Sequence, residues 1–255
     1  MNHEPEEEDD DTGEPEEGGT PDGMQPTTPK RRMPYIKFCG FMNAKEARTA
    51  VMIGADLIGI NFWPGSPRAI HFGLGRQIHE AVKKASAERG TKREARSVAV
   101  MVNPEPELVL EILREVEPDI LQFHGDEAVH VCRYFRRPFI KAFRAKGAGD
   151  AAIIQQYLGG YGVGYLLDGA PLGEYGGVGK MVVPAVASDL FQRLPRGFLA
   201  GGLTPANVGN LVRQTQPYGV DVATGIELRA GIKSPDLMAE FIRQVRAAVE
   251  NPLGL

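Results

Sequence analysis

The chain of 255 residues has room for one large domain or two small ones, and its 42% apolar and 24% charged residues are the balance of an ordinary globular protein. No apolar run approaches the roughly 20 residues that span a bilayer, and the acidic N-terminus lacks the apolar core of a signal peptide. Two cysteines are too few for a disulfide scaffold or a four-thiolate zinc site. We therefore expect a cytoplasmic protein without membrane association.

The formal net charge of −4 hides two segments of opposite charge. Residues 1–29 contain eleven acidic side chains, no Lys or Arg, no aromatic residue and only two methionines as large apolar side chains. Such a segment cannot bury enough surface to offset chain entropy, so residues 1–33 are predicted to form a disordered acidic tail. The tail is either an arm that folds back on the basic residues 30–32 or a solvated extension. Residues 30–255 carry 29 basic and 22 acidic side chains, a net charge of +7, and we expect the folded domain to span 34–255.

From Tyr35 onward, short apolar runs alternate with stretches of helical periodicity. The runs predicted as buried strands are Tyr35–Cys39, Leu57–Phe62, Ser97–Val102, Ile120–Phe123, Phe139–Phe143, Tyr165–Asp168, Gly197–Ala200 and Val220–Val222. The predicted helices are Ala44–Ile53 with Asn43 as N-cap, a segment with the stripe Ile78, Ala81, Val82 and Ala85, a helix opened by Pro104-Glu105-Pro106, and then Asp126–Phe135, Asp150–Leu158, Pro184–Arg193, Pro205–Gln214 and Ser234–Val249.

The strand runs are apolar at nearly every position, as in parallel sheets that are covered on both faces. Two parallel architectures compete, an open doubly wound sheet and a closed barrel. An open sheet usually carries a Gly-x-Gly-x-x-Gly turn after its first strand, and no such turn follows Tyr35–Cys39. Eight βα units in about 220 residues favour an α/β fold of the (β/α)8 TIM barrel type.

In such a barrel the active site lies at the C-terminal ends of the strands. Polar residues and glycines close or follow most of the predicted strands, and their convergence on one rim predicts a catalytic face. These residues are Cys39, Asn61, Ser66, Arg68, Asn103, Gln122, His124, Arg144, Asp168, Gly201, Gly202, Asp221, Thr224 and Gly225.

Two of these residues are suited to proton transfer. Asp168 directly follows an apolar strand, where partial burial raises the pKa of a carboxyl toward the range of a general acid; the same position also fits an N-cap or a loop salt bridge. Strand alternation places Lys37 and Cys39 on one face, so that a nearby ammonium would favour the Cys39 thiolate. A buried core cysteine is the alternative, although Gly40 lets the backbone turn sharply directly after it.

The glycine-rich loops indicate a phosphate. Gly201-Gly202 lies between a predicted strand and a helix start, and Thr224-Gly225 follows the last strand. Loops after strands seven and eight commonly bind phosphate in this fold through backbone N–H groups. A third loop, Glu174–Lys180, lacks the P-loop spacing and is predicted to be a mobile lid. No metal-ligand cluster is visible in the sequence.

Taken together, these residues resemble the phosphoribosylanthranilate isomerase family of tryptophan biosynthesis. The similar segments occur in the family order over about residues 35 to 250. They are Lys37–Gly40, Phe62–Arg68, Leu121–Glu127, Ile140–Arg144, Leu166–Asp168, Gly176–Lys180, Leu199–Pro205 and Gly219–Val222 with Gly225 and Glu227.

The resemblance implies a cofactor-independent Amadori rearrangement of N-(5-phosphoribosyl)anthranilate to the 1-deoxyribulose derivative. It assigns Asp168 as the general acid and Cys39 as the general base, with Arg68 on the anthranilate carboxylate, which a guanidinium matches in two hydrogen bonds. Phosphate would bind at Gly201, Gly202, Thr224 and Gly225. Supporting substrate contacts are expected from His124, Asp221 and Arg144, the last either orienting Asp168 or lining the pocket.

The chain departs from the family pattern at three places, and these departures motivate an alternative. Met181-Val182-Val183 replaces the usual segment after Lys180, Ala223-Thr224 replaces a serine pair, and Met42 replaces a common threonine. The alternative is a related barrel that binds a phosphorylated metabolite without turnover. The sister isomerase of histidine biosynthesis uses two aspartates, and Cys39 argues against it.

We expect a small-molecule substrate and a monomer or homodimer. Nucleic-acid binding is not expected, because the positive charge is spread along the chain, with Arg136-Arg137 and Lys92-Arg93 as isolated pairs.

Overall fold

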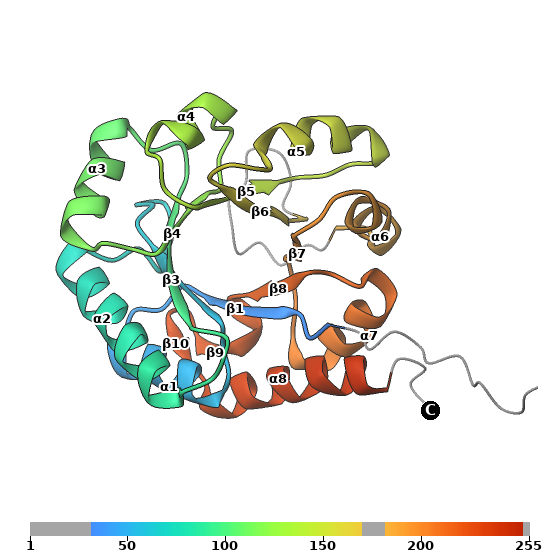
Figure 1. Ribbon diagram of the computed structural model, residues 1–255. Coiled ribbons are helices and arrows are strands. Elements are labelled where there is room, and N and C mark those ends of the chain that lie inside the picture. Colours follow the sequence, from blue (N-terminus) through green and yellow to red (C-terminus); the bar gives the residue numbers. More distant parts are fainter. Residues whose placement is uncertain (1–31, 170–181, 252–255) are drawn as a thin grey trace, which may run out of the picture. The chain divides into compact units, whose positions relative to one another are not determined.

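Eight parallel strands close into a barrel in the computed structural model, which describes residues 32–169 and 182–251 (Figure 1). The strands are β1 (Tyr35–Cys39), β2 (Leu57–Asn61), β3 (Arg96–Met101), β4 (Ile120–Phe123), β5 (Phe139–Phe143), β6 (Gly162–Leu167), β7 (Gly197–Leu199) and β8 (Gly219–Val222). Each strand pairs with the next in parallel register, and β1 pairs with β8 to close the ring. The TIM-barrel prediction is confirmed. Most of the predicted tail and all of the predicted lid lie outside the described residues.

The helices form a layer around the barrel, as Figure 1 shows. They are α1 (Ala44–Ile53), α2 (Phe72–Arg89), α3 (Pro106–Glu115), α4 (Val129–Tyr134), α5 (Ala151–Tyr157), α6 (Pro184–Arg193), α7 (Pro205–Thr215) and α8 (Pro235–Glu250), with short 3-10 turns η1 (Ala148–Asp150) and η2 (Thr224–Ile226). Within the described residues, none of these helices is both long and apolar enough to cross a membrane.

Helix α1 shows how local sequence sets the start and end of an element. Asn43 has an extended backbone, and its side-chain oxygen accepts hydrogen bonds from the backbone N–H groups of Lys45 and Glu46. Gly54 ends the helix with φ 124°, a conformation that L side chains rarely adopt. The predicted N-cap and stop are therefore confirmed.

Buried side chains form two layers, one inside the barrel and one between the barrel and the helices. Along β3 the side chains alternate between the layers, with Val98 and Val100 in the inner cluster and Ala99 and Met101 in the outer one. The inner cluster consists of Leu57, Val98, Val100, Ile120, Ile140, Ala142, Leu166, Phe198 and Ala200. This apolar filling supports the polar rim at the C-terminal ends of the strands.

Two predicted boundaries differ from the structure by three residues, and several others differ by one. Strand β6 begins at Gly162, earlier than the predicted Tyr165, because its first half contains glycines that carry no apolar signal; a Cβ on Gly162 would lie 1.8 Å from the Tyr157 carbonyl oxygen. Helix α4 begins at Val129 instead of Asp126. The intervening Glu127 carboxylate accepts hydrogen bonds from the backbone N–H groups of Asn103 and Gly125 and so holds these residues in a loop.

A small hairpin follows η2 and was not predicted. It consists of β9 (Glu227–Arg229) and β10 (Ile232–Lys233), paired antiparallel. Gly231 turns the chain between them with φ 79°, and a Cβ there would lie 2.4 Å from the sulfur of Met42. This hairpin brings Glu227 and Lys233 next to each other at the rim of the barrel.

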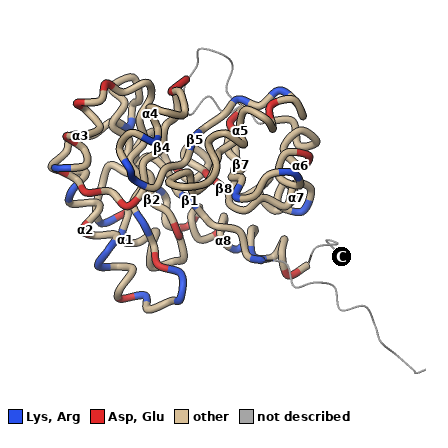
Figure 2. Tube along the Cα trace, turned by 45° about the horizontal axis from the view of Figure 1, so that its top comes forward, with Lys and Arg blue, Asp and Glu red and all other residues tan. Residues whose placement is uncertain are grey.

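Charged residues of both signs are interspersed along the outer helices (Figure 2). Several of them form exposed ion pairs, among them Arg76 with Glu115 at 3.0 Å and Arg193 with Asp189 at 2.9 Å. Exposed pairs of this kind contribute little to stability. The charges that matter for a ligand are therefore those buried at the rim.

Candidate active site

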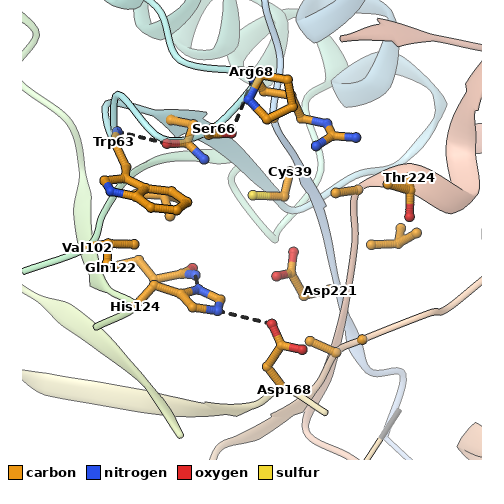
Figure 3. Close-up of a pocket in the computed structure, with 18 of the residues that line it drawn as sticks. Cys39, Trp63, Ser66, Arg68, Val102, Gln122, His124, Asp168, Asp221 and Thr224 are labelled. Atoms are coloured by element: carbon orange, nitrogen blue, oxygen red, sulfur yellow. Dashed lines mark hydrogen bonds and ion pairs between the residues drawn. The ribbon is translucent and has the colours of Figure 1, made fainter. Parts of the chain in front are cut away.

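One pocket opens at the C-terminal ends of the strands, and Figure 3 shows its walls. It brings together most of the predicted rim residues from six different strand ends. Those that line it are Cys39, Asn61, Ser66, Arg68, Gln122, His124, Asp168, Gly201, Gly202, Asp221 and Thr224. The predicted convergence is confirmed for these residues, although no ligand marks their roles.

Cys39 ends β1, and two glycines make room for it. A Cβ on Gly59, the neighbouring residue on β2, would lie 2.5 Å from the Cys39 sulfur. Gly40 follows with φ 81°, and a Cβ there would lie 2.3 Å from Cδ of Arg68. The thiol and the arginine stem therefore occupy the space that two missing side chains leave.

The charges beside Cys39 come from the seam between β1 and β8. Lys37 is fully buried, and its Nζ donates to Oδ1 of Asp221 at 2.9 Å. Burial alone would lower the pKa of Lys37, but Asp221 and Cys39 together raise it above its ordinary value, so it is an ammonium. Burial raises the pKa of the Cys39 thiol, and this outweighs the lowering by Lys37. The predicted effect of the neighbouring ammonium is therefore present, but burial outweighs it, and the pKa of Cys39 stays above its ordinary value.

Asp168 directly follows β6 and is 8% exposed. Its carboxyl group is held by residues in and directly after β4. His124 Nε2 lies 3.1 Å from its Oδ2, and the side-chain nitrogen of Gln122 lies 2.9 Å from His124 Nδ1 (Figure 3). With Gln122 as donor, Nδ1 is the acceptor, which assigns the ring hydrogen to Nε2 and directs it at the carboxylate. Gln122 Oε1 is buried without a hydrogen-bond partner among the described residues, which suits a ligand hydroxyl.

Arg68 lines the pocket and is joined to Glu227 of the hairpin. Its Nε and Nη2 donate to the two carboxylate oxygens of Glu227 at 2.7 and 2.6 Å. The side chains of Arg68 and Glu227 are 10% and 4% exposed. Burial raises the pKa of Glu227, but Arg68 and Lys233 together lower it below its ordinary value, so Glu227 is an ionised carboxylate.

Trp63 also lines the pocket, and Figure 3 draws its indole on the same side as Val102, Gln122 and His124. A Cβ on Gly65 would lie 2.4 Å from this ring. The loop after β2 thus supplies a flat aromatic surface together with Arg68.

The two glycine loops meet at the end of the pocket near β7 and β8. Gly201 and Gly202 have φ values of 82° and 62°, which turn the chain from β7 toward α7. The side chain of Asn207, on α7, holds Gly202 in place by donating a hydrogen bond to its carbonyl oxygen at 2.9 Å. Thr224 begins η2 and also lines the pocket. Such turns and helix starts are typical anion sites.

Gly225 lets these two loops approach each other. A Cβ on Gly225 would lie 1.9 Å from the Leu203 carbonyl oxygen, which is backbone and must move. We expect Gly225→Ala to lower the free energy of unfolding by about 1 to 3 kcal/mol and to weaken phosphate binding. Thermal and urea unfolding measure the first effect. Gly149→Ala, where a Cβ meets nothing within 4 Å, is the matched control, and equal stabilities of both variants would contradict the prediction.

Three predicted rim residues do not line this pocket. Arg144 lines the neighbouring cavity, which shares His124 and Asp168, and its Nη1 lies 3.4 Å from Oδ1 of Asp126. Asn103 accepts a hydrogen bond from the backbone N–H of Asp126 and so shapes a loop. Gly225 is in η2, next to the lining residue Thr224, and packs against the Leu203 backbone. Direct substrate contact by Arg144 and phosphate contact by Gly225 remain predictions.

Sequence reasoning missed the buried charges of the hairpin. In the sequence, Glu227 stands out only through the family resemblance, and Lys233 belongs to no recognisable motif. Both flank a glycine turn, a pattern that usually marks an exposed hairpin, so the local sequence carries no sign of their burial.

The sequence profile of the N-(5'-phosphoribosyl)anthranilate isomerase family matches residues 36–244 of this chain. The chain belongs to this family. Isomerases of the family from Acidithiobacillus ferrooxidans and Pseudomonas aeruginosa (strain LESB58) are 38% and 39% identical to it, and the matches cover 84% and 83% of this chain and 98% and 95% of theirs.

Solved structures of phosphoribosylanthranilate isomerases are similar to this barrel. The enzyme from Thermotoga maritima superposes with a TM-score of 0.70 at 32% identity, covering 84% of this chain and all of that one. A structure in complex with reduced 1-(o-carboxyphenylamino)-1-deoxyribulose 5-phosphate gives a TM-score of 0.68 at 28% identity, with 84% and 100% covered. The T. maritima enzyme is described as dimeric; for this chain, monomer or homodimer stays a prediction.

Proposed function

We propose that this chain converts N-(5-phosphoribosyl)anthranilate into 1-(2-carboxyphenylamino)-1-deoxyribulose 5-phosphate, the step of tryptophan biosynthesis that its family name describes. The observation that carries the proposal is a single pocket lined by Cys39, Asp168, Arg68 and the glycine turn after β7. One acid, one base, a carboxylate-binding cation and a phosphate site are what this substrate and this rearrangement require.

Asp168 is the general acid. It protonates the furanose ring oxygen, the bond from this oxygen to C1 breaks, and the nitrogen lone pair forms an iminium ion. His124 donates to Oδ2 and so fixes the position of the carboxyl group at the pocket. When the proton has been transferred, the same hydrogen bond stabilises the carboxylate that is left.

Cys39 is the general base. Its thiolate removes the proton from C2, which gives an enolamine that tautomerises to the ketone. Lys37 lies next to the thiol and lowers its pKa against the effect of burial, so it stabilises the negative charge of the thiolate once formed. The proposed steps are ring opening and proton transfers within one molecule, and we propose that they need neither cofactor nor metal.

The two anionic ends of the substrate fix its orientation. Arg68 binds the anthranilate carboxylate near β2, while Gly202 and Thr224 bind the 5-phosphate near β7 and β8 through backbone N–H groups. The ribose then spans the pocket between Cys39 and Asp168. Two anion sites at opposite ends hold the sugar in one direction, which positions C2 for the base.

Loss of substrate fluorescence tests the proposal. Phosphoribosylanthranilate should lose its fluorescence when the purified full chain is added, and the ketone carbon of the product, which has the same mass as the substrate, should be identified by NMR. Ligand-dependent thermal stabilisation with unchanged fluorescence would instead identify a barrel that binds the metabolite without turnover.

A further inference from the structure

Three buried charges meet beside the pocket, and we call Arg68, Glu227 and Lys233 the charge triad. Glu227 Oε1 accepts hydrogen bonds from Arg68 Nε and Lys233 Nζ, both at 2.7 Å, and from the Gly231 backbone N–H at 3.2 Å. Lys233 is 2% exposed, and its side chain does not reach solvent. A single carboxylate therefore lies between two cations, one of which lines the pocket and one of which does not.

The contacts of Lys233 require its charged form. Its Nζ donates to the carbonyl oxygens of Cys39 at 2.6 Å and Ala223 at 3.1 Å, besides Glu227. An ammonium has three N–H groups, and here three acceptors are provided for them, whereas a neutral amine would leave one acceptor without a donor. Burial lowers the pKa of Lys233, and Glu227 opposes this. The triad thus contains two positive charges and one negative charge.

Arg68 has two edges that can each hold a carboxylate in two hydrogen bonds. Glu227 occupies the edge formed by Nε and Nη2. Within residues 32–169 and 182–251, no hydrogen bond engages the edge formed by Nη1 and the second hydrogen of Nη2, and Arg68 itself lines the pocket. Geometry alone therefore allows Arg68 to bind a second carboxylate, but the charge of Arg68 is already balanced by Glu227.

We propose that Lys233, which cannot touch the substrate, supplies the positive charge that makes Arg68 selective for a carboxylate. Arg68 and Glu227 without Lys233 form a neutral pair, which has little attraction for an anion. With Lys233 the triad carries one net positive charge, and one substrate carboxylate neutralises it. Because all three side chains are largely shielded from water, this balance is weakly screened. Lys233 is thus a positioning residue that determines specificity.

The inference rests on the proposed function, since it takes Arg68 as the anthranilate contact, and it is tested by binding rather than turnover. Two ligands are compared by calorimetry: reduced 1-(o-carboxyphenylamino)-1-deoxyribulose 5-phosphate and its counterpart with aniline in place of anthranilate. In Lys233→Met we expect the first to bind at least about tenfold more weakly and the second to change less than about threefold. Equal weakening of both ligands would overturn the inference, because a distorted pocket affects both.

A double variant separates charge from geometry. Lys233→Met combined with Glu227→Gln leaves Arg68 as the only charge, so the net charge is again +1. We expect this variant to recover most of the carboxylate preference, and it keeps the inference testable even where the single variant does not fold. A double variant without the preference would overturn the inference.

The control Arg76→Met removes one surface positive charge that is paired with Glu115, and we expect it to bind both ligands as the unmodified chain does. Weakening of the carboxylate ligand by this control would mean that total charge, not the triad, is responsible. Absence of turnover in the unmodified chain would reject the proposed function, whereas the triad is judged from the ratio of the two affinities.

Discussion

Asp168→Asn is expected to lower kcat by at least about a hundredfold, the lower end of what a positioned acid contributes. An amide has the shape of the carboxyl group but no proton to give to the ring oxygen. Its oxygen still accepts the hydrogen bond from His124 Nε2, so the pocket keeps its form. Steady-state kinetics at saturating substrate measure the loss, and thermal unfolding checks that the variant is folded.

Asp126→Asn is the matched control for this change. Asp126 follows β4 on the same rim, but its side chain is 66% exposed and it does not line the pocket. We expect kcat to stay within about twofold of the unmodified chain, as for an exposed substitution away from the reacting atoms. If Asp168→Asn kept the unmodified kcat, Asp168 would have no role as the acid.

Cys39→Ser is expected to reduce kcat by a similar factor, at least about a hundredfold, because a hydroxyl is a far weaker acid than a thiol and stays protonated. Cys132→Ala is its control. Cys132 is the buried residue of α4 and does not line the pocket, and burial raises the pKa of its thiol to about 12. It should lower stability but leave kcat largely unchanged. Full activity of Cys39→Ser would remove Cys39 from the mechanism.

The same thiol sets the direction of the pH dependence. The pKa of Cys39 is raised by burial, so at neutral pH the free protein holds the thiol, and the thiolate fraction grows as pH rises. We therefore expect kcat/KM to increase with pH above neutrality. Lys37→Met removes the main opposing charge and leaves Asp221, which raises the pKa of Cys39, so the increase should move to higher pH.

The barrel could be predicted because its signals are local. Continuous apolar runs such as Leu57–Phe62 mark strands that are buried on both faces, and parallel strands bring their C-terminal ends to one rim. The position of Cys39, Asp168 and Arg68 in one pocket follows from this topology without knowledge of any contact. The first half of β6 could not be predicted, because its glycines pack closely but contribute no apolar signal to the sequence.

Charge balance could not be predicted because it depends on packing between distant elements. The spacing of Lys37 and Cys39 indicates a neighbouring ammonium, but not that burial of the thiol outweighs it. Similarly, Arg68 is separated from Glu227 by 159 positions, and only the closure of β8 against β1 joins them. Alternation along a strand predicts which face a side chain lies on, whereas the pKa of that side chain depends on all the groups that surround it.

The chain contains a single tryptophan, Trp63, and this residue lines the pocket. Indole emission of the folded protein therefore originates beside the substrate and not from an average over the molecule. An anthranilate group absorbs near-ultraviolet light in the range where indole emits, so a bound ligand with this group accepts the excitation energy of Trp63. The fluorescence of Trp63 therefore reports on the site, and the rates of ligand binding and release can be measured without an added label.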